Sequence, residues 1–431
     1  MVRGGAWRLI RVVRYRCRRG VLGASARSQC MTSEATADAA DGEREPGTPW
    51  VGLGVIAREW GRIGCIGFGG PPTHIALLRQ LCVQRRGWIS ASEFEDGIAA
   101  TNLLPGPAST QLAIFTAWRL RGMPGALVGG VCFIVPGLAL ILALAALFLA
   151  GDPPLWVLGA AAGAGSAVAA VAVQAARALM PASWKRAGDR RAARARWVGY
   201  TLAGGAAAAL AGPWMVLVLV AAGLVEMGVR TRPAVPGPRG GAAWPVPLAL
   251  AAPAAGGLGA LAWVAFKVGA LSYGGGFVII PLMQADAVDR YHWMSDGQFL
   301  NAVALGQITP GPVVQTVAVV GYAAAGLAGG LLAAAMAFAP SFLLVILGGS
   351  RFDQLRSSAA VQGFFSGAGP AVIGAIAGSA IPLALVLHGW QFGVLAAAAV
   401  WLLGLQRGVV SALLGAGALG IAAALAGWPA T

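Results

Sequence analysis

The sequence has few charged residues, few histidines and no informative cysteine pattern. Only 11% of its 431 residues are charged, whereas soluble domains carry roughly a quarter. Its three histidines are scattered, and its five cysteines form neither a CxxC pair nor a spacing that suits a metal ion. These absences argue against a soluble domain, a disulfide framework and a zinc site. We therefore expect neither a metal nor a cofactor.

Long uncharged stretches take the place of the missing charges. Hydrophobic residues make up 58% of the chain, and its 64 glycines suit membrane helices that pack through small side chains. A helix needs about 20 apolar residues to cross a bilayer core. The stretches that reach this length without a charged residue are 122–151, 153–176, 197–225, 240–266, 297–350, 357–406 and 408–431. The sequence predicts an all-α polytopic membrane protein.

Residues 1–50 differ from the rest of the chain. The first 27 hold eight arginines and no acidic residue, and they lack the apolar run of at least ~7 residues that a signal peptide needs. Residues 31–49 are acidic and rich in small residues, which is typical of disorder. We interpret 1–50 as a disordered tail, or as sequence upstream of a true start at Met31.

The chain repeats itself at an offset of 205 residues. Of the 50 positions in 64–113, 15 are identical to their counterparts in 269–318. Generic hydrophobicity would not align tryptophans and prolines over that length, so we infer an internal duplication, which is typical of secondary transporters. The predicted divisions are an N-terminal repeat (51–230), a cytoplasmic linker (231–244) and a C-terminal repeat (245–431).

Basic residues indicate how the two repeats face the membrane. The segment 177–196 holds seven basic residues, whereas its counterpart 382–401 holds none. Cytoplasmic loops are enriched in Lys and Arg, so the same loop is predicted to be cytoplasmic in one repeat and periplasmic in the other. This pattern favours inverted-topology repeats. A parallel arrangement stays open, because acidic residues contribute little to the rule.

Each repeat has a Pro-Gly-Pro motif that predicts a broken helix. The segments around the first motif, 93–104 and 107–121, are each shorter than a full span, which fits a re-entrant hairpin or two tilted helices. Proline suits the first turn of a helix, and two exposed helix N-termini suit an oxyanion. A break that serves packing alone is the alternative. The candidate binding residues are Asn102, Pro105, Gly106, Pro107, Ser109, Thr110 and Gln111, with Gln307, Thr309, Pro310, Gly311, Pro312, Gln315 and Thr316 in the second repeat.

A second pair of helix breaks lies upstream of these motifs. Arg62 and Lys267 occupy equivalent positions, each about two helical turns before a glycine pair, and so on the same face as that pair. Cations inside apolar helices usually line a pathway. Snorkelling to the membrane interface is the alternative. We add both cations to the candidate binding residues, together with the residues of the breaks: Gly69, Gly70, Pro71, Gly274 and Gly275.

Two titratable residues near the motifs are candidates for proton coupling. Asp96 lies in the short helix before the first Pro-Gly-Pro motif, where its equivalent in the second repeat is Asn301. His74 follows the first glycine pair, and an unperturbed histidine titrates near neutrality. We also count His74 among the candidate binding residues. An ordinary hydrogen-bonded histidine is the alternative.

These motifs together resemble the signature of the chromate ion transporter family. FGGPPTHI, RRGWIS and LLPGPASTQLA match its N-terminal copy, and YGGGFVIIPLM and ITPGPVVQTVA resemble its C-terminal copy, as in the long-chain, two-domain members. The resemblance covers about residues 53–425. Where the family has Asn after Pro-Gly-Pro, this chain has Ala108. The residues that carry the match are Gly69, Gly70, Pro71, His74, Arg85, Trp88, Pro105, Gly106 and Pro107.

The resemblance implies export of chromate from the bacterial cytoplasm, driven by the membrane potential or the proton gradient, which confers chromate resistance. Sulfate is the expected competitor. The expected location is the bacterial inner (plasma) membrane, as a multi-pass protein. The expected partners are the oxyanion and the lipid bilayer; a homodimer is left open. Nucleic acid is not expected, because no segment could form a folded basic domain.

A membrane-embedded enzyme that acts on a lipid phosphate is the alternative function. Such an enzyme would also bind phosphate at helix N-termini. It would need clustered carboxylates for a metal ion or a histidine nucleophile, and the histidines His74, His292 and His388 are far apart in the sequence. We therefore expect a transporter and not an enzyme.

Overall fold

The computed structural model describes residues 50–101, 104, 106–150, 153–210, 215–231, 257–272, 279–348 and 358–429. Four candidate binding residues, Asn102, Pro105, Gly274 and Gly275, lie outside these ranges, as does the N-terminal segment 1–49. Residues 50–431 form one unit by their internal contacts.

The described residues are helical and include no strand, which confirms the all-α fold class. In the first repeat the helices are α3 (Leu53–Ile66), α4 (Pro71–Arg79), α5 (Ala91–Thr101), α6 (Ala108–Phe148), α7 (Leu155–Ser166), α8 (Val168–Ala187), α9 (Arg191–Leu210) and α10 (Met215–Arg230). In the second they are α11 (Leu258–Leu271), α12 (Ile279–Gln284), α13 (Asp296–Ile308), α14 (Thr316–Gly348), α16 (Ala359–Leu385), α17 (Gln391–Ala399) and α18 (Val409–Leu425). Short π-helical turns, η1 (Gln80–Arg85), η4 (Ala285–Arg290) and η7 (Val400–Gly404), continue α4, α12 and α17.

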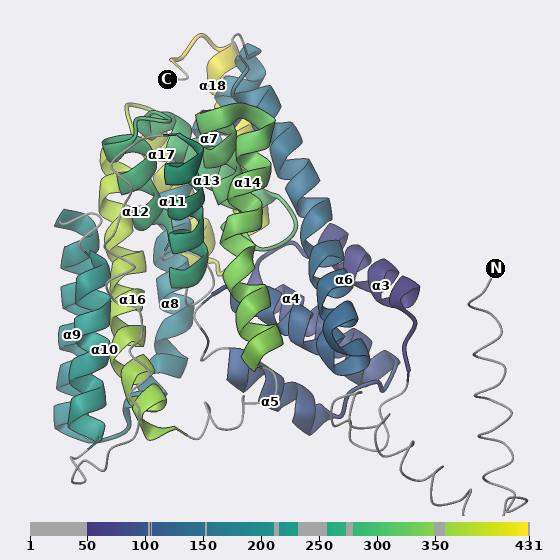
Figure 1. Cartoon of the computed structure of the whole chain (residues 1–431). Helices are drawn as coiled ribbons and strands as arrows, with labels where there is room; N and C mark the ends of the chain where they lie inside the picture. The colour runs from purple at the N-terminus through teal and green to yellow at the C-terminus, as the bar shows by residue number, and fades with distance from the viewer. Residues whose placement is uncertain are drawn as a thin grey trace, which may run out of the picture. The chain divides into compact units, whose positions relative to one another are not determined.

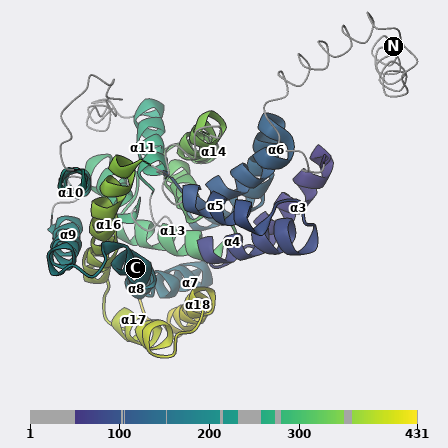
Figure 2. The same ribbon diagram turned by 90° about the horizontal axis from the view of Figure 1, so that it is seen from below.

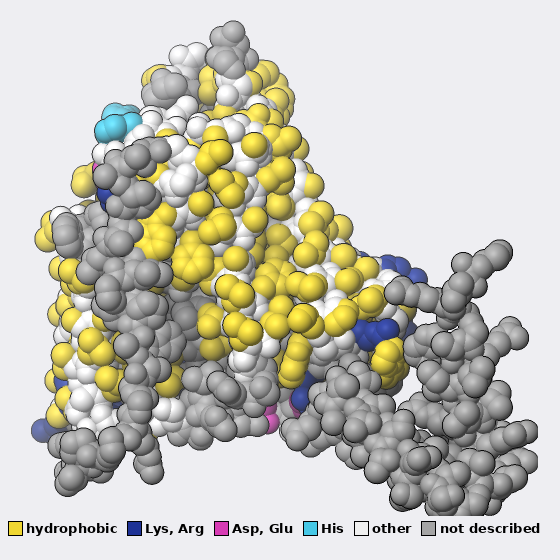
Figure 3. All heavy atoms as spheres, viewed as in Figure 1, with side chains coloured by type: hydrophobic (Ala, Val, Ile, Leu, Met, Phe, Trp, Pro, Cys, Tyr) yellow, Lys and Arg dark blue, Asp and Glu magenta, His cyan; other side chains and the backbone are white. Residues whose placement is uncertain are grey.

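Four segments of the described chain are long and apolar enough to cross a membrane. They are Ala108–Phe148, Leu155–Ala187, Val313–Gly348 and Ala359–Leu385, judged by length and composition. Figure 3 shows hydrophobic side chains over much of the visible face, with few Lys and Arg side chains among them. Both observations confirm a multi-pass membrane protein.

Two of these long helices turn back on themselves. Gly122 in α6 and Gly326 in α14 have nearly the same backbone angles, φ 61° and ψ −151° against φ 61° and ψ −154°. Positive φ is readily available to glycine alone, so these residues permit the reversal. Past the turn in α14, a methyl group added at Gly330 would lie 3.0 Å from the carbonyl oxygen of Ala318. Each long helix is therefore a helical hairpin. The arms of α6 are α6a (108–120) and α6b (123–148), and the arms of α14 are α14a (316–324) and α14b (327–348).

The first Pro-Gly-Pro motif lies at the tip of another hairpin, formed by α5 and α6a. Glu93 near the start of α5 pairs with Arg119 near the end of α6a. The ring of Phe115 packs against Gly97, between these ends and the tip. The chain thus returns to the side from which it started, and residues 106–117 at the tip are buried. This is the re-entrant arrangement that the short segments predicted.

The two repeats are intertwined. Helix α16 of the second repeat packs against α8, α9 and α10 of the first, and α17 and α18 of the second pack against α7. Figures 1 and 2 show both groups. Each repeat thus places its C-terminal helix pair on the long span of the other. The core is shared rather than divided between the repeats.

Equivalent elements lie at opposite ends of the long helices. In Figure 1, α4 and α5 lie in the lower part of the view and their equivalents α12 and α13 in the upper part. The same holds for α9 and α10 against α17 and α18. This is the inverted arrangement that the basic residues favoured. The end at which α4 and α5 lie is the predicted cytoplasmic end, because the first repeat's loops hold the Lys and Arg residues.

Candidate anion site

The two Pro-Gly-Pro motifs form matching turns. Gly106 and Gly311 have φ of 129° and 105°. Pro107 then caps α6a, while Pro312 leads into the 3-10 turn η5 (Val313–Gln315) before α14. Because the first N–H groups of a helix have no partner within it, each turn presents backbone donors and the positive end of a helix dipole.

Each turn is held by the helix break of the other repeat. The amide of Gly106 donates to the carbonyl oxygen of Ser272 at 2.8 Å, and the amide of Gly311 donates to that of Gly67 at 3.0 Å. Gly67 and Ser272 are equivalent positions of the repeats, as are Gly106 and Gly311. The two hydrogen bonds are therefore related by the repeat symmetry. The breaks that the sequence predicted separately meet across the repeat interface.

The side chains of Gln111 and Ser341 lie against Gly106 of the first turn, and Thr110 and Ser272 add two further buried hydroxyls to the residues that form or hold it. Ser272 and Ser341 are fully buried, and their hydroxyls, with that of Thr110, have no hydrogen-bond partner among the described residues. Ser341 Oγ would lie 3.1 Å from a methyl group added at Gly106. We call Gly106, Thr110, Ser272 and Ser341 the Gly106 cluster. A buried polar group without a partner costs about 1–3 kcal/mol, and the described residues leave the hydrogen-bonding capacity of these three hydroxyls unused.

The second turn is filled differently. Gln315 Nε2 donates to the carbonyl oxygen of Ile134 at 2.9 Å. The hydroxyls of Thr309 and Thr316 donate to helix carbonyls at 2.9 and 2.8 Å. Where the first turn has the hydroxyl of Ser272, the second has Gly67. Its unpartnered groups among the described residues are side-chain amide atoms, Gln307 Nε2 and Gln315 Oε1. The two turns thus share a backbone and a glutamine amide beside the glycine, Gln111 at Gly106 and Gln315 at Gly311, and they differ at the position of Ser272 and Gly67.

The predicted cations pair with carboxylates. Arg62 is half-exposed on α3 and lies 3.3 Å from Glu59, whose buried carboxylate also contacts Arg86 at 3.3 Å. Lys267 of α11, whose side chain is 10% exposed, pairs with Asp286 of η4. Among the described residues, the ion pairs of both cations thus go to carboxylates rather than to either Pro-Gly-Pro turn.

The other candidate residues fall into two groups. His74 is buried, and its Nε2 donates to the carbonyl oxygen of Gly67 at 2.8 Å, so it supports the break that holds the second turn. Ser109 and Gln111 are buried in the first turn of α6a. By contrast, Asp96 is on the exposed face of α5. Gly69, Gly70 and Pro71 are exposed or half-exposed at the start of α4.

Sequence reasoning missed Ser272 and Ser341. Ser272 directly precedes the second glycine break, and Ser341 follows a proline within α14b. A serine beside a helix break in an apolar segment is the signal that could have drawn attention to each. Only the fold shows that they share one turn.

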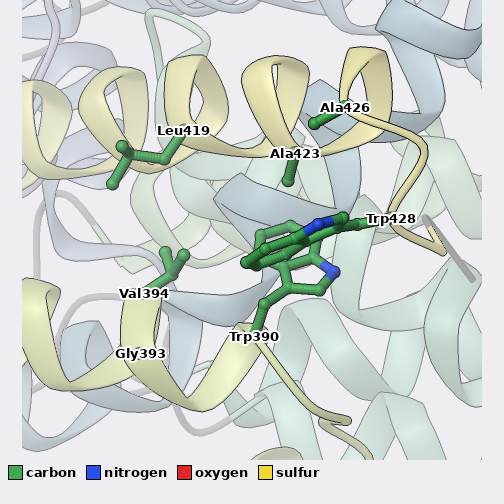
Figure 4. A pocket seen from close by; sticks show the side chains of 7 residues that line it. All are labelled: Trp390, Gly393, Val394, Leu419, Ala423, Ala426 and Trp428. Atoms are coloured by element: carbon green, nitrogen blue, oxygen red, sulfur yellow. The ribbon is translucent and has the colours of Figure 1, made fainter.

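A separate pocket of about 310 Å³ lies between α17 and α18 (Figure 4). Trp390 and Trp428 line it, with ring centroids 6.5 Å apart, among aliphatic side chains such as Val394 and Leu419. Trp390 Nε1 donates to the carbonyl oxygen of Pro429. Paired tryptophans at helix ends are typical of a membrane interface. The pocket offers no charged group to an anion.

Inverted repeats of broken helices that meet around a buried polar cluster define a multi-pass membrane transporter. The chain belongs to the chromate transporter family, which matches residues 55–227 and 259–421. It is 33% identical to a chromate transport protein of Cupriavidus metallidurans over 75% of this chain and 80% of the relative. It is 30% identical to a chromate transport protein of Pseudomonas aeruginosa (75% and 79%) and 27% identical to a probable one of Synechococcus elongatus (78% and 85%).

No solved structure matches the chain. Family membership confirms the resemblance read from the motifs. It also confirms that the protein is a transporter rather than an enzyme, and that it is located in the bacterial inner membrane as a multi-pass protein.

Proposed function

We propose that this chain exports chromate, and sulfate as a structurally similar oxyanion, from the bacterial cytoplasm by secondary active transport, which confers chromate resistance. The Gly106 cluster carries this proposal. It offers a buried helix N-terminus and unpartnered hydroxyls at the interface of the two repeats. Substrate sites at repeat interfaces, where half-helix N-termini point at an anion, are typical of transporters with inverted repeats.

Chromate is a tetrahedral dianion, so its hydration shell must be replaced by several strong donors. Hydroxyl groups and backbone N–H groups do this from fixed positions. A helix N-terminus supplies about half a positive charge, which leaves most of the dianion's charge unbalanced. Lys267 precedes Ser272 by five residues, or about 7.5 Å of helix rise, and we assign it the balancing charge.

We assign the arginines around Glu59 a role in access. Arg58, Arg62 and Arg86 place three cations against one buried carboxylate at the predicted cytoplasmic end, which leaves an excess of positive charge. Such a surface raises the local concentration of anions. An inside-negative potential then drives the anion outward, with about 2.3 kcal/mol per elementary charge per 100 mV.

Flux measurements on the purified protein in proteoliposomes test this function. An imposed potassium diffusion potential should drive radiolabelled chromate toward the positive side, and excess sulfate should slow it. Absence of protein-dependent flux, or flux that ignores the potential, would contradict secondary active transport. Release of phosphate from lipid instead of chromate flux would favour the lipid-phosphate enzyme.

A further inference from the structure

The pair of Lys267 and Asp286 is the most deeply buried ion pair among the described residues. Their side chains are 10% and 2% exposed, and they join α11 to the π-helical turn η4. A buried pair of this kind is weak support for stability, because apolar residues of similar size are often as stable. Ionisable residues inside membrane proteins more often mark ion pathways.

The first repeat forms the equivalent π-helical turn without a carboxylate at the position of Asp286, while its cation Arg62 pairs with Glu59 of its own helix. The turns η1 and η4 are equivalent and make the same backbone hydrogen bond, Arg86 N–H to Leu81 O at 3.1 Å and Tyr291 N–H to Asp286 O at 2.9 Å. Asp286 thus stands where the first repeat has a buried leucine, Leu81. The same π-helical backbone forms around either residue, so the carboxylate calls for a different explanation.

Lys267 is linked to the Gly106 cluster through the end of its own helix, α11. Lys267 and Ser272 are five residues apart, and the carbonyl oxygen of Ser272 holds the amide of Gly106. An anion bound at this cluster would bring a second negative group to the end of the helix that carries the ammonium group of Lys267. The turn η4 is π-helical, and such turns are frequent at functional sites.

We propose that the anion displaces Asp286 from Lys267 and that the released carboxylate takes up one proton, so that each dianion crosses the membrane with one proton. This rests on the proposed function. The step is balanced: the ammonium group exchanges one carboxylate partner for the anion, and Asp286 binds one hydronium-derived proton from the side on which the anion enters. On release the proton leaves and the ion pair re-forms.

The surroundings of Asp286 favour this exchange. A buried carboxylate without a cation is costly in its charged form, so it binds a proton or regains a partner. The helices α12 and α16, which pack nearby, carry no titratable side chain, and α14 carries Tyr322. The remaining charged or titratable groups of η4, the turn after it and α13 are Asp289, Arg290, Tyr291, His292 and Asp296. Of these, Asp289, Arg290 and Asp296 are exposed, so none replaces Lys267 as a buried cation beside Asp286.

The consequence is a net movement of one negative charge for each dianion. Sulfate is the sharper probe, because it is almost entirely unprotonated at neutral pH and cannot carry the proton itself. In proteoliposomes, the reversal potential of sulfate flux gives the charge moved per anion, and an internal pH dye reports the proton. We expect one net charge and one proton per sulfate for the unaltered chain.

Two variants separate coupling from binding. Asp286→Asn should abolish the proton movement and raise the charge moved to two per sulfate. The double variant Lys267→Met with Asp286→Leu removes both charges at once and places at 286 the residue type of Leu81; it should lose proton movement along with at least ten-fold in anion affinity. Glu93→Gln, which breaks the Arg119 ion pair away from the cluster, should leave the stoichiometry unchanged.

The proposal is overturned if the unaltered chain moves two charges and no proton per sulfate. It is equally overturned if Asp286→Asn still moves the proton. Neither result contradicts the proposed function, because each is observed only when the protein transports the anion. Loss of flux in the unaltered chain, by contrast, overturns the proposed function itself.

Discussion

Ser272 and Ser341 place two hydroxyl groups in a part of the molecule where neither has a hydrogen-bond partner among the described residues. Both are fully buried. A hydroxyl donates one hydrogen bond and accepts others, so it can turn its donor toward an anion. The equivalent of Ser272 at the second turn, Gly67, has no side chain to offer. In the described part of the chain, the first turn thus has unpartnered hydroxyls, whereas the hydroxyls of Thr309 and Thr316 at the second turn donate to helix carbonyls.

Ser272→Ala and Ser341→Ala should each weaken chromate binding about ten-fold, because a hydrogen bond to a charged group contributes roughly 1.5–3 kcal/mol. Titration of the purified protein with chromate measures this. Ser379→Ala is the matched control, since its buried hydroxyl already donates to Ile376 O at 2.7 Å. Equal affinities for all three variants would show that the cluster does not bind the anion.

Arg62→Gln should act on rate rather than on affinity. Its side chain is 50% exposed, so it attracts anions through solvent, where salt screens it over about 10 Å at 0.1 M. The variant should therefore slow chromate uptake into the site at low ionic strength and match the unaltered chain at high ionic strength. A loss of affinity that persists at high salt would instead place Arg62 in direct contact with the anion.

At the scale of elements, α6 and α14 show what sequence patterns reveal about broken helices. The Pro-Gly-Pro motifs predicted the helix starts at Ala108 and near Thr316, because proline and glycine act locally. The reversal at Gly122 falls where the sequence divided the short segment 107–121 from the uncharged stretch 122–151, whereas the reversal at Gly326 was not predicted, since it lies inside the uncharged stretch 297–350. The partners of the turns, Ser272 and Gly67, were also beyond prediction. Contacts between residues more than 160 positions apart leave no local signature.

Gly326→Ala should destabilise the hairpin of α14. A methyl group there would meet no atom within 4 Å, so the effect is one of backbone strain at φ 61° alone. Such strain costs about 1–3 kcal/mol. Thermal unfolding in detergent should show a lower midpoint. Gly228 in α10 is the matched control, because a methyl group there also meets no atom within 4 Å but the backbone is helical. The Gly228→Ala variant should unfold at the same temperature as the unaltered chain, or at a higher one. Equal midpoints for the two variants would contradict the reversal.

At the scale of the whole molecule, the two repeats share one core and one site. Helix α16 is covered by α9 and α10 of the other repeat, and each Pro-Gly-Pro turn is held by a break of the other repeat. The duplication could be predicted from the identical residues at equivalent positions of the two repeats, and the inverted arrangement from the distribution of basic residues between their loops. The packing of each repeat's C-terminal helix pair on the other repeat could not be predicted, because the helices of both repeats have similar apolar faces.

Cysteine accessibility tests the orientation of the repeats. In a cysteine-free background, a cysteine at position 190 should resist an impermeant thiol reagent added outside intact cells, because the basic loop 177–196 is predicted to be cytoplasmic. Cysteines at 290 and 388 should react. Reaction of 190 and 290 from the same side would favour the parallel arrangement.

The most direct test of the anion site is anomalous scattering from crystals grown with chromate, with data collected at the chromium absorption edge. The account predicts one peak roughly 4 Å from the hydroxyl oxygens of Ser272 and Ser341. This distance combines the length of a hydrogen bond to a chromate oxygen with the chromium–oxygen bond that continues from it. The peak should disappear in the double variant Ser272→Ala with Ser341→Ala. A peak beside Gly311, or among the arginines around Glu59, with none beside Gly106, would contradict it.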